Sequence, residues 1–102
     1  MFSTLVPYHF SGHATSQARK RGISEQMIDQ IICYGDEYWA GNGAHAYYLG
    51  TRAINSAIQK DYFSREEKIL LYSALQGSVV ISNTVIITVM HATQPPKHWR
   101  RS

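Results

Sequence analysis

Apolar residues at helical spacing predict two short helices near the start of the chain. Ala14 and Ala18 lie four residues apart in a segment expected to be helical at about 12–20. The apolar stripe of the second helix consists of Met27, Ile28, Ile31 and Ile32. The residues expected to cap or end these helices are Ser11 or Gly12 with Gly22, and Ser24 with Gly35. The two segments together predict a helical hairpin at about 12–34.

Alternating and β-branched segments predict two strand hairpins. Residues 37–40 and 44–49 flank a Gly-Asn-Gly turn, and residues 79–81 and 85–90 flank a Ser-Asn-Thr turn. The second pair is rich in valine and isoleucine, which is typical of the centre of a sheet. Residues 5–10 are a candidate short edge strand, limited by the proline within them.

Two further helices are expected between these hairpins. One opens at Thr51 and carries an apolar face of Ala53, Ile54, Ala57 and Ile58. The other begins with a capping box formed by Ser64 and Glu67 and extends to about Gln76. This order predicts an α+β fold, in which the helical hairpin and the further helices pack on one face of a small antiparallel sheet. We expect a single domain, residues 1–102, with an irregular basic tail at about 92–102.

Composition narrows the class of protein. An apolar fraction of 44% and an aromatic fraction of 12% exclude intrinsic disorder. No apolar run is long enough to span a membrane, and Cys33 is the single cysteine, so a disulfide framework is excluded and a reducing cytoplasm is expected. The net charge is +3, with the bases gathered at residues 19–21 and in the tail. This distribution permits an anionic partner.

The polar residues of the first helix are the most informative. His13 and Gln17 are four residues apart and share a helix face, and Arg21 lies near the same edge. An imidazole transfers protons near neutral pH and a guanidinium stabilises charge on phosphate oxygens, a combination that suits phosphodiester chemistry. The ordinary alternative is a histidine that hydrogen-bonds the backbone near the helix start, beside solvated arginines.

Three more candidates lie further along the chain. Arg52 begins a helix, where free backbone N–H groups favour an anion, and Tyr48 on the strand before it is a candidate base contact. Thr88 places a hydroxyl in an apolar strand, on the face of Ile86 and opposite His91 if the strand alternates regularly. The alternatives are a surface arginine, a core tyrosine and a half-buried threonine.

Another histidine and the tail complete the candidates. His45 shares a strand face with Tyr47 and is either a second imidazole of the site or an exposed strand histidine. A zinc site is disfavoured because no paired ligand spacing connects His13, His45 and His91. The tail combines an aromatic with bases suited to phosphate contact, or is a frayed end; its basic residues are Lys97, Arg100 and Arg101.

Three motifs resemble a family of small bacterial proteins of unknown function. They are HA-x-x-x-x-x-x-RGIS from His13 to Ser24, Tyr-Tyr-Leu-Gly-Thr-Arg-Ala-Ile from Tyr47 to Ile54, and a terminal valine- and isoleucine-rich hairpin that contains Thr88. The family usually opens with HA-x-x-R-x-x-x-RGIS, so Gln17 stands where an arginine is usual. The family is similar in outline to the RelE/ParE/BrnT-like toxins, which place an αα-hairpin on an antiparallel sheet.

The resemblance implies a toxin-type endoribonuclease that cleaves RNA, tRNA or mRNA, by attack of the 2′-OH on the adjacent phosphate without a metal or cofactor. A cognate antitoxin or immunity protein would restrain it. The residues expected to be catalytic are His13, Arg21, Arg52 and Thr88. Those expected to hold the substrate are Gln17, Tyr48, Lys97, Arg100 and Arg101.

Two other functions remain open from the sequence. A non-enzymatic protein of the same fold would bind or inhibit a partner protein, and the glutamine at position 17 favours this interpretation. A nucleic-acid-binding regulator would bind tightly, lose affinity steeply with salt and cleave nothing.

Overall fold

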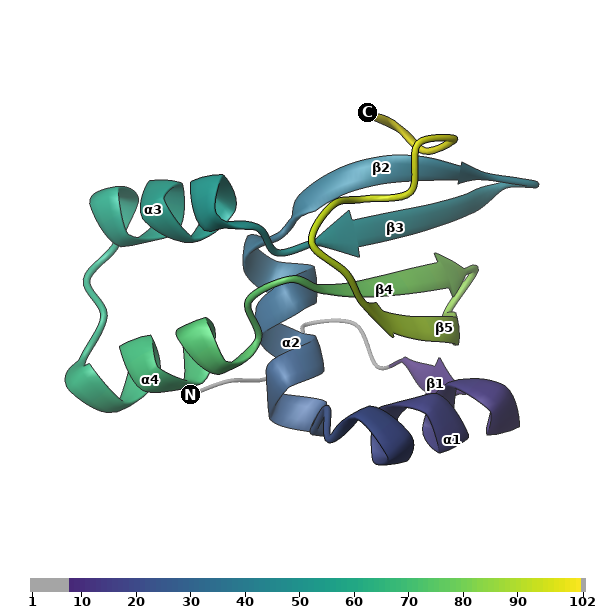
Figure 1. The fold of residues 1–102 in the computed structure, drawn as a ribbon, viewed down its shortest axis with the longest axis horizontal. Coiled ribbons are helices and arrows are strands. Elements are labelled where there is room, and N and C mark those ends of the chain that lie inside the picture. The colour runs from purple at the N-terminus through teal and green to yellow at the C-terminus, as the bar shows by residue number, and fades with distance from the viewer. Residues whose placement is uncertain (1–7, 102) are drawn as a thin grey trace.

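The sheet has six strands within residues 8–101, the part of the chain that the computed structural model describes. The strands are β1 His9–Phe10, β2 Asp36–Gly41, β3 Ala44–Tyr48, β4 Gly77–Ser82, β5 Val85–His91 and β6 Arg100–Arg101. The helices in the same residues are α1 Gly12–Arg21, α2 Glu25–Tyr34, α3 Thr51–Lys60 and α4 Arg65–Ser73. The spatial order of the strands is β1-β5-β4-β3-β2-β6 (Figure 1). The predicted α+β class and helical hairpin are confirmed.

The helix ends follow the predicted capping chemistry. The hydroxyls of Ser11 and Ser24 each accept a hydrogen bond from the backbone N–H three residues later, which opens α1 and α2. At α4, Ser64 and Glu67 exchange reciprocal hydrogen bonds and form the expected capping box. Gly22 ends α1 with φ +66°, a left-handed conformation that glycine adopts at little cost.

The sheet is mixed rather than antiparallel, which corrects one part of the prediction. β1 pairs in parallel with β5, because His9 lies beside Val85 and Phe10 beside Ile86. Parallel neighbouring strands require a crossover connection. Between β1 and β5 the chain forms α1 to α4 and the strands β2, β3 and β4. Of the candidate strand at residues 5–10, only residues 9 and 10 pair with the sheet, and residues 5–7 lie outside the described residues.

The basic tail is ordered against the sheet, which corrects the prediction that it is irregular throughout. Its residues Arg100 and Arg101 form β6, which pairs antiparallel with β2. Trp99 is buried, and its ring centroid lies 5.8 Å from that of Tyr38. Burial of a large aromatic side chain holds this segment, and pairing with the edge strand extends the sheet.

Helices cover one face of the sheet and the C-terminal segment covers the other (Figure 1). α1 lies against β5, and α2 lies against β4 and β3, while α3 and α4 contact α2 beside the sheet. The larger core lies between helices and sheet, and a smaller core of Tyr38, Ala44, Ala46, Tyr48, Val80 and Trp99 lies on the opposite face. Among residues 8–101, no helix combines the length and the apolar character needed to cross a membrane.

Candidate functional site

Two of the predicted site residues on α1 hold the backbone of β5. Gln17 Oε1 accepts a hydrogen bond from the N–H of Val89 at 2.9 Å, and Arg21 Nη1 donates one to the carbonyl of Val89 at 2.8 Å. β1 pairs only with Val85 and Ile86, so these polar groups of Val89 lie on a stretch of strand edge that α1 covers. Both side chains therefore have a structural role, because they satisfy backbone groups that an exposed edge would offer to another strand.

His13 lies one helical turn before Gln17 and is exposed. Its imidazole has no hydrogen bond or ion pair within the described part of the chain, so nothing there orients it. A general base is ordinarily oriented by a partner that fixes its tautomer and direction. The prediction that His13 is catalytic therefore stays without structural support from a neighbouring group.

Thr88 lies across the sheet from α1. The register of β4 and β5 shifts between Val80 and Ile81, so that Thr88 pairs with Val80 on the face covered by the C-terminal segment. Ile86 packs in the core beneath the helices. The expectation that Thr88 and Ile86 share a face is therefore wrong, because the bulge reverses the alternation between them.

Arg52 lies at the opposite side of the sheet, beside β2. Its guanidinium is 3.9 Å from Asp36 Oδ2, and the guanidinium of Arg101 is 3.7 Å from Asp36 Oδ1. β4 and β3 separate β2 from β5, a spacing of roughly 14 Å for strands about 4.8 Å apart. The predicted catalytic set is therefore divided among α1, the far face of β5 and the start of α3.

Tyr48 is a core residue. Its side chain is buried in the smaller core, and its hydroxyl donates a hydrogen bond to the carbonyl of Ala92 at 3.0 Å. Burial, with a further contribution from Tyr38, raises the pKa of Tyr48 and keeps it neutral. Because the ring is enclosed, a nucleic-acid base has no free face of Tyr48 on which to stack, which corrects its predicted role in binding.

The β2–β3 hairpin assembles polar and aromatic groups that the sequence-based set missed. His45 Nδ1 lies 3.1 Å from Glu37 Oε2, and Tyr47 donates a hydrogen bond to the same oxygen at 3.4 Å. Nδ1 is shielded from solvent, and its contact is close without the alignment of a hydrogen bond. We call Glu37, Trp39, His45, Tyr47 and Arg100 the hairpin cluster.

Trp39 and Arg100 lie in register with this histidine. Trp39 pairs with His45 on one side and with Arg100 on the other, so the three side chains share a sheet face. The centroids of the Trp39 and His45 rings are 4.5 Å apart with planes at 37°, and Trp39 is 48% exposed. The cluster therefore places a cation, an exposed aromatic, an imidazole and a carboxylate in a continuous row.

A cavity of about 150 Å³ adjoins the row. Its walls are Tyr8, Glu37, His45, Tyr47, Ile81 and Asn83. Burial and then the neighbouring Glu37 carboxylate raise the pKa of Tyr47, so its hydroxyl stays protonated at neutral pH. Lys97 is exposed in the C-terminal segment, and Arg101 lies on the other face, with its guanidinium 5.7 Å from the Tyr38 ring centroid. Arg100 is thus the predicted substrate-binding cation that lies on the same sheet face as Trp39 and His45, with the strand of Trp39 between them.

One sequence signal pointed toward the cluster. The alternation of His45 and Tyr47 puts both on one strand face, whereas Trp39 lies opposite His45 because of a register shift between Trp39 and Gly41. The sequence made Arg100 a substrate-binding candidate but could not predict its place beside Trp39, because that pairing depends on the folding of a tail with no strand pattern. Within residues 8–101, no group of three histidine, cysteine, aspartate or glutamate side chains is arranged to hold a metal ion.

No protein-family model, curated protein or solved structure matches this chain.

Proposed function

We propose that this protein is a toxin-type endoribonuclease of the cytoplasm that cleaves RNA without a metal, and that the hairpin cluster is its catalytic site. The observation that carries the proposal is the contact of His45 Nδ1 with Glu37 at 3.1 Å, beside the exposed ring of Trp39. In catalytic triads a carboxylate behind the imidazole holds the ring in position for proton transfer. The HA…RGIS opening resembles that of a family of small bacterial proteins of unknown function, and the similarity in outline of that family to RelE/ParE/BrnT-like toxins supports the same reaction class.

The cluster supplies each group that the reaction needs. His45 takes the proton of the 2′-OH as its oxygen attacks phosphorus, and Arg100 stabilises the negative charge that develops on the phosphate oxygens. The bond from phosphorus to the 5′-oxygen breaks, and the hydroxyl of Tyr47 supplies the proton that this oxygen takes. Proton transfer from His45 to Tyr47 through solvent restores both groups. The products are a 2′,3′-cyclic phosphate and a 5′-hydroxyl.

The substrate would be held by one unpaired base and the phosphate beside it. Aromatic faces bind single-stranded bases by stacking, and the Trp39 indole is the exposed aromatic in the hairpin cluster. A loop of tRNA or an unpaired stretch of mRNA offers such a base. Because this activity would damage its own cell, the proposal includes a cognate antitoxin or immunity protein that restrains it.

The test is incubation with tRNA and with total bacterial RNA in EDTA, followed by analysis of the product ends. We expect cleavage that leaves 2′,3′-cyclic phosphate and 5′-hydroxyl ends. Arg100→Ala should slow cleavage by about 100-fold, the scale expected for loss of one group that stabilises transition-state charge. Lys20→Ala, the loss of an exposed cation on α1, is the matched control and should change the rate little. Products with 5′-phosphate ends would contradict the mechanism.

A second candidate is a non-enzymatic protein that binds a partner protein. One observation favours it, the cluster of exposed aromatic and aliphatic side chains at α4, far from the hairpin cluster. RNA that stays intact at every protein concentration, together with binding of a protein partner, would select this function over cleavage.

A further inference from the structure

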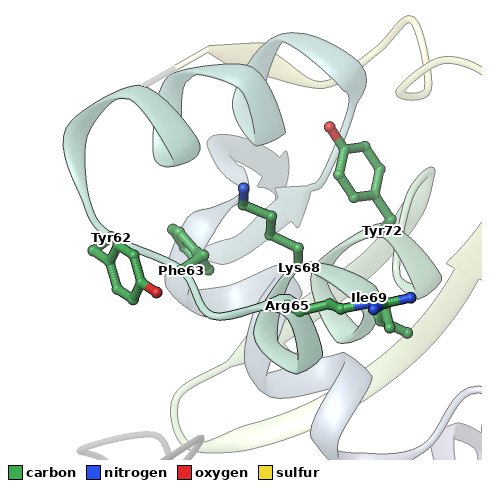
Figure 2. A pocket seen from close by; sticks show the side chains of 6 residues that line it. All are labelled: Tyr62, Phe63, Arg65, Lys68, Ile69 and Tyr72. Atoms are coloured by element: carbon green, nitrogen blue, oxygen red, sulfur yellow. The ribbon is translucent and has the colours of Figure 1, made fainter.

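A groove of about 570 Å³ lies along α4 and the loop that joins α3 to it, at the end of the molecule opposite the β2–β3 turn (Figures 1 and 2). It is lined by Tyr62, Phe63, Arg65, Lys68, Ile69 and Tyr72. Phe63 is buried at its base against the ring of Tyr34. Figure 2 shows Lys68 and Tyr72 rising from α4 toward α3, with Tyr62 at the other end of the groove.

The groove exposes more apolar surface than a solvated helix face requires. Tyr62 is 91% exposed, Ile69 62% and Tyr72 49%. Within residues 8–101, the only other large hydrophobic side chain with such exposure is Trp39 of the hairpin cluster. Apolar side chains scattered singly on a surface are ordinary, but a contiguous patch of them commonly marks a binding surface.

The charges at the groove have a single sign. Arg65 and Lys68 are the charged residues of its lining, and neither forms an ion pair within the described part of the chain. Of the acidic residues close to these cations in the sequence, Glu67 is bonded to the backbone of Ser64, and neither Asp61 nor Glu66 lines the groove. Positions 65, 68, 69 and 72 follow the spacing of one helix face, so the cations flank the apolar side chains along the groove.

We propose that this groove binds an amphipathic helix of a partner protein that carries carboxylates beside its apolar stripe. Apolar residues at helical spacing would cover Ile69 and Tyr72, and flanking carboxylates would pair with Arg65 and Lys68. The inference does not depend on RNA cleavage. His45 follows the β2–β3 turn, and this turn and α4 lie at opposite ends of the molecule (Figure 1), so a helix in this groove leaves His45 uncovered.

The test is selection from a display library of helical peptides, with the polar positions randomised between acidic, basic and neutral residues. We expect the enriched peptides to be acidic and to bind the wild-type protein at least about tenfold more tightly than the Ile69→Ser, Tyr72→Ser double variant. Both substituted side chains are exposed, so the variant should keep its fold, which circular dichroism checks. Lys68→Glu should weaken the binding of acidic peptides. Lys20→Glu on α1 makes the same charge change elsewhere and should leave their binding unchanged.

Four results would overturn the proposal. The first is enrichment of basic or neutral peptides, and the second is binding that the double variant retains; failure to enrich any peptide counts equally against it. Sedimentation of the wild-type protein, but not the double variant, with phosphatidylserine vesicles would assign the groove to a membrane surface instead. None of these results bears on RNA cleavage, because the assay measures binding alone.

Discussion

The hydrogen bonds that Gln17 and Arg21 form with the backbone of Val89 predict a stability cost on substitution of two residues that the sequence made candidates for function. A hydrogen bond between neutral groups contributes about 0.5–1.5 kcal/mol to folding, and one to a charged group about 1.5–3 kcal/mol. Arg21 is exposed, so solvent reduces its share to about the lower end of that range. We therefore expect Gln17→Ala to cost about 1 kcal/mol and Arg21→Ala about 1.5 kcal/mol.

Thermal unfolding followed by circular dichroism measures these costs. A loss of 1 kcal/mol lowers the Tm of a domain of this size by about 4–8 °C. Arg19→Ala is the matched control, because it removes a cation from the same turn of α1 and has no hydrogen bond to β5. The double variant Gln17→Ala, Arg21→Ala should also aggregate more readily, since the strand edge at Val89 becomes available for pairing.

The same variants separate a structural role from a catalytic one. If the two side chains serve the fold, the folded fraction of each variant cleaves RNA at the wild-type rate. Unfolding of Gln17→Ala and Arg21→Ala at the same temperature as Arg19→Ala would refute the structural role of the two side chains. Full stability with lost cleavage would return both residues to the site that the sequence predicted.

Three further changes test other parts of the structure. Gly35→Ala should destabilise by about 1–3 kcal/mol in urea unfolding, because its Cβ would strike backbone carbonyls of α2 and β3, and an unchanged midpoint would contradict that packing. The pKa of Glu67 is lowered, first by its bond to the backbone of Ser64, so the stability it contributes is complete above pH 4.5 and is lost as pH falls through the lowered pKa. Glu67→Gln should therefore flatten the fall in Tm below pH 4.5 relative to wild type, and a fall as steep as that of wild type would count against the capping bond. Trp99→Ala should lower the free energy of unfolding by about 3–5 kcal/mol, and the C-terminal segment should lose its contact with Tyr38 and its protection from hydrogen exchange. Retained protection would show that strand pairing alone holds this segment.

Local chemistry explains why most elements could be predicted. The capping residues Ser11, Ser24 and Ser64 fix helix starts through contacts only three residues long, and Gly22 and the Gly-Asn-Gly turn fix reversals in the same way. These signals do not depend on the remainder of the fold. The end of α4 was less well marked, since the helix stops at Ser73 rather than near Gln76.

Long-range pairing explains what could not be predicted. The parallel contact of β1 with β5 and the pairing of β6 with β2 join segments distant in the chain, and neither strand is longer than two residues. The bulge that turns Thr88 away from the helices could not be predicted from the sequence of β5, because that sequence has the pattern of a regular apolar strand. The expected site was divided for the same reason, because its residues came from motifs whose mutual positions depend on the sheet order.

The candidate site was visible in part. The sequence placed His45 and Tyr47 on one strand face. The partner that distinguishes His45 from an ordinary strand histidine is Glu37, which lies on the other strand of the hairpin and also accepts a hydrogen bond from Tyr47. His13 occupies the more distinctive motif but has no orienting neighbour among the described residues. The geometry therefore favours His45 as the catalytic histidine, whereas the sequence motif favours His13.

The most direct test of the proposed site compares two single variants, His45→Gln and His13→Gln, for cleavage of tRNA in EDTA. Both histidine side chains reach the surface, so each variant should keep the wild-type Tm to within a few degrees. We predict that His45→Gln lowers the cleavage rate by about 100-fold or more, as expected for loss of a general base, and that His13→Gln leaves it unchanged. Cleavage that survives in His45→Gln and disappears in His13→Gln would contradict the account and place the site on α1.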